Sequence, residues 1–489
     1  MRFSISKTLI LMSFTILALS TYGQKYYNLE FDAKIYDSQT LSFEGKSFSV
    51  RAYENIVYVS NPVDTTYQKM NIYIPEEYFA GKKINGYSAQ SAPIFFPNKV
   101  GGYMPAKPAS TKNNPTGGGD QRQNAVLFAL SKGCIVASAG ARGRTLKDES
   151  GIYTGKAPAG IVDLKAAIRY LRYNDKNMPG DASKIISNGT SAGGAMSTLL
   201  GATGNHADFE PFLKAIGAAN TMDDIFAVSA YCPITNLDNA DMAYEWQFFG
   251  VNTYRKGGPM QSISQGTLEL SSEQIAVSKK LKELFPAYVN SLKLEDKKGT
   301  ILTLDNNGNG TFKEWIKSYV VASAQKALDA DVDLSSFVFL TVTNGKVIQI
   351  DFDAYVKYMQ RQKTPPAFDA LDLSGPETNL FGSATKNNQH FTQFGAAHST
   401  TEATSADALA VKMMNPMNYI GDINSKTSKY WRIRHGTKDK DTGLAISVIL
   451  ATLLENKGFD VNVELPWERP HSGDYDLHEL FAWIDLICK

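Results

Sequence analysis

The feature that most constrains the fold is the run Gly-Thr-Ser-Ala-Gly-Gly at residues 189–194. An apolar segment typical of a strand, residues 184–187, precedes it, and a stretch of small and apolar residues typical of a helix follows it. A Gly-x-Ser-x-Gly pattern between a strand and a helix predicts a tight turn that exposes its serine at the end of the strand. Such a turn has no room for large flanking side chains, which accounts for the glycines. Ser191 is therefore the candidate nucleophile.

Other segments extend this strand–turn–helix unit into a fold. Continuous apolar runs at residues 94–96 and 134–139 indicate strands covered on both faces, as in a parallel sheet. Helical periodicity appears between them at residues 161–171, and again at 444–454 and 477–488. This alternation predicts an α/β protein, and together with the serine turn it predicts the α/β-hydrolase fold. We expect a mostly parallel central sheet with helices on both faces.

The predicted core is interrupted once. Residues 236–410 are richer in polar and turn residues and carry mixed helical pieces, so we expect one large inserted lid domain there. The hydrolase core would then consist of residues 24–235 and 411–489. Within the insertion, residues 305–310 imitate the start of a calcium loop, but Ile316 stands where a bidentate glutamate is required. We predict a β-turn there and no metal site.

The first 23 residues have the layout of a secretory signal peptide. Arg2 and Lys7 precede an apolar run at residues 8–19, and small residues follow it up to Gly23. The run is too short to span a bilayer as a helix. No cysteine lies near the cleavage point, so we expect a secreted or periplasmic protein without a lipid anchor or membrane span.

Charge and cysteine content exclude some classes of protein. The chain has 50 basic and 49 acidic residues, and this balance argues against a nucleic-acid partner. Three cysteines are too few for a disulfide framework, and Cys134 lies in an apolar strand. The sequence leaves open whether Cys232 and Cys488 form a disulfide, and it does not determine the oligomeric state.

A serine nucleophile needs a general base, and in this fold the chain order is serine, acid, histidine. His471 lies in a loop between a predicted strand at residues 461–465 and the last helix, and it is the preferred base. His478, the alternative, is inside that helix.

The acid is expected in the loop after the preceding strand, which reads His-Gly-Thr-Lys-Asp-Lys-Asp-Thr at residues 435–442. We prefer Asp439. Asp441 is the rival, with an N-cap of the following helix as its structural alternative. His435 ends the strand and is interpreted as structural.

The oxyanion hole requires two amide donors. One follows the nucleophile and is that of Ala192. The other is expected in the glycine-bearing loop after the strand at residues 94–96, where Gly102 is preferred to Gly101. No cofactor is needed for this chemistry.

Beyond these motifs, the sequence resembles the bacterial tannases of the non-fungal type, subtype B-like, which are tannin acylhydrolases of the α/β-hydrolase superfamily. The resemblance extends over most of the mature chain. It is densest at residues 98–105, 138–144, 188–196, 226–246, 363–382, 431–442 and 467–477.

The resemblance implies hydrolysis of galloyl esters by a triad of Ser191, Asp439 and His471. It also implies that a lysine, a glutamate and an aspartate bind the three phenolic hydroxyls of the galloyl ring. The matching positions are Lys363, Glu377 and Asp441. Without the resemblance, Lys363 and Glu377 would be interpreted as solvated surface charges.

The expected function is thus secreted hydrolysis of small aromatic esters such as gallate esters and tannins. A feruloyl or general carboxylesterase with the same triad is the first alternative. A non-catalytic polyphenol- or glycan-binding protein and a serine peptidase are weaker ones, because all three triad candidates are present and no propeller-like repeat precedes the core.

Overall fold

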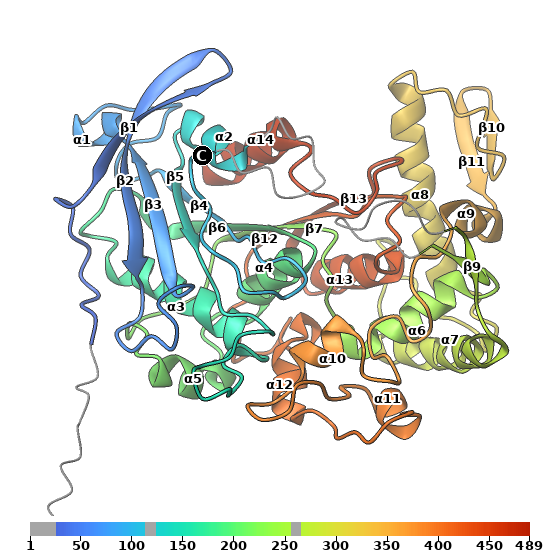
Figure 1. Ribbon diagram of the computed structural model, residues 1–489. Coiled ribbons are helices and arrows are strands. Elements are labelled where there is room, and N and C mark those ends of the chain that lie inside the picture. The colour runs from blue at the N-terminus through green and yellow to red at the C-terminus, as the bar shows by residue number, and fades with distance from the viewer. Residues whose placement is uncertain (1–25, 113–123, 256–265) are drawn as a thin grey trace, which may run out of the picture.

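A computed structural model describes residues 26–112, 124–255 and 266–489, and the predicted signal peptide lies outside this part of the chain. The central element is a nine-stranded sheet with the order β1-β2-β3-β5-β4-β6-β7-β12-β13 (Figure 1). Its strands are β1 (Asp37–Phe43), β2 (Lys46–Val57), β3 (Lys69–Pro75), β4 (Pro93–Pro97), β5 (Ile135–Ala139), β6 (Asp181–Thr190), β7 (Ala227–Tyr231), β12 (Tyr430–Arg434) and β13 (Asp460–Glu464).

The sheet is mixed, and the serine turn at residues 189–194 lies in its parallel part. Strands β5, β4, β6, β7, β12 and β13 run parallel to one another, whereas β1, β2 and β3 form an antiparallel edge whose last strand, β3, pairs antiparallel with β5. Every residue of β4, β5 and β7 is buried, as expected for strands covered on both faces. The predicted fold class, an α/β-hydrolase fold with a mostly parallel sheet, is confirmed.

Helices cover both faces of this sheet (Figure 1). On one face, α2 (Ala125–Ser131) and α14 (Leu477–Cys488) meet through Phe128 and Phe481, whose stacked rings lie 5.0 Å apart, and Phe481 also packs on Phe95 of β4. On the other lie α3 (Ala159–Tyr173), α4 (Ala192–Ala202) and α13 (Leu444–Asn456). A Cβ on Gly201 of α4 would collide with the ring of Trp431 in β12, so this helix lies directly on the sheet.

The chain between β7 and β12 adds no strand to the main sheet in its described residues. It contains the helices α6 (Leu237–Phe248), α7 (Ser272–Leu292), α8 (Thr311–Asp329), α9 (Phe352–Met359), α10 (Pro376–Leu380), α11 (Gln393–Ala397) and α12 (Ala408–Met413), and the strand pairs β8–β9 (Thr253–Tyr254, Leu268–Glu269) and β10–β11 (Leu340–Thr343, Lys346–Ile350). Two short helices lie before this segment, α1 (Glu76–Phe79) and α5 (Glu210–Ala215).

The two ends of this segment meet. Asn415 Nδ2 donates hydrogen bonds to Asn236 Oδ1 at 2.8 Å and to Asp238 Oδ1 at 2.7 Å. The division into a core and a separate lid domain stays a prediction. In the described part of the chain, no helix is both long enough and apolar enough to cross a membrane.

Candidate active site

Ser191 lies where β6 ends and α4 begins, in a conformation that few side chains adopt. Its φ is +61° and its ψ is −124°. A Cβ on Gly189 would overlap the Gly193 carbonyl, and one on Gly193 would lie 2.8 Å from the Val100 carbonyl oxygen. The glycines are therefore required by backbone contacts on both sides of the turn. Such strain persists where the surrounding structure enforces it, most often at functional sites.

His471 and Asp439 come together from two loops at the carboxyl ends of neighbouring strands. His471 follows β13, Asp439 follows β12, and His471 Nδ1 lies 2.8 Å from Asp439 Oδ2. The Asp439 carboxylate is fully buried, and its other oxygen accepts the Asp441 N–H at 2.9 Å. Asp439 is thus fixed in place and orients the imidazole.

These contacts discriminate between the two candidate acids. Asp441 Oδ2 lies 3.7 Å from His471 Nδ1, which is beyond hydrogen-bond distance. The N-cap of α13 is Gly443, so the capping alternative for Asp441 is not realised either. Asp441 instead accepts a 2.8 Å hydrogen bond from Gln362 Nε2, beside Lys363.

The histidine loop packs against the serine turn. A Cβ on Gly473 would overlap the Thr190 hydroxyl, so the loop passes directly over the residue before Ser191. The hydrogen bonds of the described residues include none between Ser191 and His471. His471 Nε2 faces Cys232 Sγ at 3.9 Å instead. Catalytic hydrogen bonds are often long without substrate and shorten when it binds.

The charges set the protonation of this cluster. Burial lowers the pKa of His471, but its neighbours, first the Asp439 carboxylate and then Cys232, together raise it by more, so the net pKa is well above its usual value. Burial raises the pKa of Asp439, whereas His471 and His435 lower it to about 2. Asp439 therefore stays ionised and stabilises a protonated His471, as the acid of a hydrolase triad must.

Cys232 is a neighbour that sequence reasoning did not place here. It directly follows β7, the strand beside β6, with φ +36°. Burial raises the pKa of its thiol, which disfavours a thiolate nucleophile. Cys134, Cys232 and Cys488 are all free, so the disulfide left open by the sequence is not formed. Its position could have been predicted, because Cys232 directly follows β7 and β7 is the neighbour of β6, the strand that ends at the serine turn.

Cys232, Asp439 and His471 also form a candidate metal group, because one ligand atom of each lies within 4.8 Å of the others. Thiol and imidazole ligands suit a thiophilic ion. An ion there would coordinate the same imidazole that accepts the serine proton in a hydrolase. These three ligands therefore fit an inhibitory metal ion better than a catalytic one.

The other two histidines of the C-terminal part, His435 and His478, make different contacts. His435 is buried, its Nδ1 lies 2.9 Å from Ser447 Oγ, and burial lowers its pKa. His478 is exposed on α14, 3.4 Å from Glu44.

Two loops supply candidate oxyanion donors. Ala192 is the first residue of α4, so no residue within the helix can accept its N–H. In the loop after β4, Gly102 has φ +53°, and its carbonyl oxygen accepts a 2.8 Å hydrogen bond from Arg144 Nε. The Arg144 contact holds this loop in place; Arg144 lies within the resemblance at residues 138–144, but its own role was not predicted.

One of the predicted ring-binding residues, Glu377, has a buried oxygen without a partner among the described residues, and the other two act on its charge. Glu377 of α10 is buried, and its Oε2 has no hydrogen-bond partner among the described residues. Burial raises the Glu377 pKa, and Lys363 opposes this rise. The Asp441 charge adds to the rise of the Glu377 pKa. Lys363 Nζ lies 3.9 Å from the centre of the Phe368 ring. A buried acceptor without a donor is costly, and a phenol can satisfy it.

Several known proteins are similar to this chain. A family model described as BD-FAE, an esterase family, matches residues 129–262. A tannase from Fusobacterium nucleatum is 52% identical, with a TM-score of 0.89 over 95% of this chain and 100% of the other. No curated protein matches the sequence.

A tannin acyl hydrolase from Lactobacillus plantarum is 46% identical, with a TM-score of 0.89 over 94% of this chain and 99% of the other. A tannin acyl hydrolase in complex with ethyl gallate is also 46% identical, with a TM-score of 0.88 over the same shares of the two chains. These likenesses cover nearly the whole chain, including the segment between β7 and β12. The chain therefore belongs to the bacterial tannases, a family of carboxylic ester hydrolases.

Proposed function

We propose that this protein is an exported serine esterase that hydrolyses galloyl esters through an acyl-enzyme. Ser191 Oγ attacks the ester carbonyl, and His471 Nε2 takes its proton. The Ala192 and Gly102 amides stabilise the oxyanion. His471 then gives the proton to the departing alcohol, and water, activated by the same imidazole, releases gallic acid. No step calls for a cofactor.

One observation carries the choice of acyl group. The buried Glu377 Oε2 has no hydrogen-bond partner in the described part of the chain, and the charges of Lys363 and Asp441 both act on the Glu377 carboxyl. A trihydroxyphenyl ring offers three hydroxyls, which can donate to the carboxylates of a glutamate and an aspartate and accept from an ammonium group. The similar hydrolase in complex with ethyl gallate supports the same ligand class.

The test compares methyl gallate, methyl ferulate and 4-nitrophenyl acetate. We expect methyl gallate to have the highest kcat/KM, and Ser191→Ala to lower turnover by roughly 10⁴-fold or more. Glu377→Gln should lower kcat/KM on methyl gallate roughly 10- to 100-fold, because it weakens a charged hydrogen bond, and should leave nitrophenyl acetate nearly unchanged.

Equal or faster ferulate turnover would favour the feruloyl esterase alternative. Binding of methyl gallate without hydrolysis by the wild type would favour a binding protein. Export is tested separately: mass spectrometry of the protein recovered outside the cytoplasm should find an N-terminus near Gln24, and a full-length cytoplasmic protein would contradict it.

A further inference from the structure

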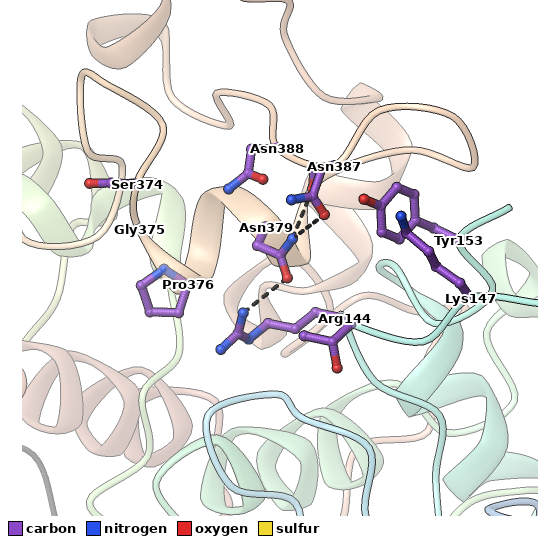
Figure 2. A pocket seen from close by; sticks show the side chains of 10 residues that line it. Arg144, Lys147, Tyr153, Ser374, Gly375, Pro376, Asn379, Asn387 and Asn388 are labelled. Atoms are coloured by element: carbon purple, nitrogen blue, oxygen red, sulfur yellow. Dashed lines mark hydrogen bonds between the residues drawn. The ribbon is translucent and has the colours of Figure 1, made fainter. Parts of the chain in front are cut away.

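A pocket of about 340 Å³ lies among helices of the segment between β7 and β12, at the right of Figure 1. It is formed by the end of α6 with residues 249–251, by α7, by residues 307–313 at the start of α8, and by α9. It shares no lining residue with the pocket beside α10, where Arg144 donates a hydrogen bond to Asn379 (Figure 2) and also contacts the candidate oxyanion loop. Its volume is in the range of small-molecule sites.

One wall of this pocket is the turn whose sequence imitates the start of a calcium loop. Asp305 Oδ1 accepts the N–H groups of Asn307 and Asn309 at 2.9 Å each, so this carboxylate closes the turn. Trp246 Nε1 donates to the Gly308 carbonyl oxygen at 2.9 Å, and a Cβ on Gly308 would lie 2.7 Å from the same nitrogen. The turn is therefore fixed against the indole, and this wall has a defined shape.

Aromatic side chains form the apolar part of the pocket, and ammonium groups lie beside them. Phe249 is 39% exposed, whereas Phe352 and Val356 of α9 are buried. Lys282 Nζ lies 4.6 Å from the centre of the Phe249 ring, and Lys313 Nζ lies 5.5 Å from the centre of the Phe352 ring. The pocket thus places positive charge next to an apolar surface, which suits a ligand that has both an apolar body and a negative group.

The charge of the pocket is positive. Its lining residues include three lysines, Lys282, Lys313 and Lys357, and one carboxylate, that of Asp353. Lys313 Nζ pairs with Asp353 at 3.3 Å and donates to Asn309 Oδ1 at 3.2 Å. Lys282 and Lys357 form no ion pair with the residues that the structure describes. An anion bound here would therefore meet two ammonium groups that no carboxylate neutralises.

We propose that this pocket is an accessory site that binds a small aromatic carboxylate. The ring packs against Phe249, the carboxylate pairs with Lys282, and Lys357 adds a second positive charge to the same pocket. An inorganic anion would leave the aromatic wall uncovered, and a neutral ring would leave both ammonium groups unpaired. Gallate, the acid that the proposed reaction releases, belongs to this class of ligand, but the inference depends on the pocket alone and not on that reaction.

The test measures the binding of benzoate by isothermal titration calorimetry. Benzoate has no phenolic hydroxyl for the proposed ring-binding residues of the active site. We expect Lys282→Ala to raise its Kd roughly five- to tenfold, because a charged hydrogen bond is lost, and Lys357→Ala to raise it by less. Benzyl alcohol, which lacks the carboxylate, and cyclohexanecarboxylate, which lacks the aromatic ring, should both bind more weakly than benzoate. The matched control is Lys429→Ala, since Lys429 is also exposed beside an aromatic ring, 4.8 Å from the centre of Tyr430, and its loss should leave the Kd unchanged.

Three results would overturn the proposal. The first is that the wild type does not bind benzoate, or binds it no better than Lys282→Ala does. The second is that Glu377→Gln weakens benzoate binding and Lys282→Ala does not, which would place the ligand in the candidate active site. The third is that cyclohexanecarboxylate binds as tightly as benzoate, which would remove the aromatic requirement. None of these measurements needs turnover, so methyl gallate hydrolysis tests the proposed function separately.

Discussion

At the scale of single residues, the site depends on how the protein places charges near one imidazole. His471 is nearly surrounded by protein, which alone would favour its neutral form, yet the groups around it, first of all Asp439 at 2.8 Å, raise its pKa well above the usual value. The neighbouring thiol of Cys232 stays protonated because it is buried. Serine chemistry is therefore favoured over cysteine chemistry at the same imidazole.

Asp439→Asn should change both the rate and its pH dependence. A base must be neutral to accept the serine proton, so activity rises with pH through the raised pKa of His471. Without the Asp439 charge, burial lowers that pKa, and the acid limb of the kcat/KM profile should move to lower pH. We expect kcat to fall roughly 10⁴-fold. The measurement is the pH profile of methyl gallate hydrolysis.

Asp441→Asn is the control for that experiment. It should raise KM for methyl gallate and move the acid limb less than Asp439→Asn does, because Asp441 Oδ2 lies 3.7 Å from His471 Nδ1 whereas Asp439 Oδ2 lies 2.8 Å from it. The reverse pattern, in which only Asp441→Asn moves the limb, would reassign the acid.

At the scale of elements, the distance between nucleophile and base is set by contact between two loops. The histidine loop follows β13 and the serine turn follows β6, and they meet where Gly473 lies against Thr190. The strand order of the sheet brings these loops to one edge, but close packing between them sets the final position of His471.

Gly473→Ala should therefore damage catalysis more than stability. The added Cβ overlaps the Thr190 hydroxyl, and a displacement of about 1 Å can cost on the order of 100-fold in rate. We expect such a loss in kcat with little change in the melting temperature measured by calorimetry.

Two further variants sharpen this test. Thr190→Ala should partly restore the activity of Gly473→Ala, because it removes the overlapping hydroxyl. Gly266→Ala, where an added Cβ meets nothing within 4 Å, should leave kcat unchanged. Absence of rescue would show that the Thr190 contact does not position the loop.

At the scale of the whole molecule, the segment between β7 and β12 is joined internally by a buried carboxyl. Asp241 of α6 accepts the backbone N–H groups of Phe368 at 2.7 Å and of Asp369 at 3.1 Å. Burial, and then the Asp369 carboxylate, raise the pKa of Asp241 to about 8. One carboxyl thus makes the connection between α6 and the chain before α10 sensitive to pH.

The free energy of unfolding should fall as pH rises because of this group. A carboxyl with a raised folded pKa contributes its full stability below its unfolded pKa of about 4, and loses it as pH rises to about 8. Asp241→Asn should reduce this pH dependence by on the order of a few kcal/mol between pH 5 and pH 8, as measured by urea unfolding. Asp333→Asn, at an exposed carboxyl with a lowered pKa, is the control and should leave the pH dependence of the free energy of unfolding over the same interval unchanged. Equal pH dependence in wild type and Asp241→Asn would contradict the assignment.

The sequence by itself determined the sheet, its helices and the serine turn. Apolar periodicity and glycine requirements are local properties, so the strands β4, β5 and β6 and the elbow at Ser191 could be derived from short windows of residues. Chain order also nominated His471 and Asp439, because loops after parallel strands meet at one edge of the sheet.

Only the tertiary structure decided which of these side chains meet, and with what else. No local pattern indicates that Arg144 supports Gly102, that Cys232 faces His471, or that Glu377 Oε2 is buried with no partner among the residues that the structure describes. Each of these facts is a contact between segments that are distant in the chain, and its energy depends on burial and neighbouring charge, which a sequence window does not contain.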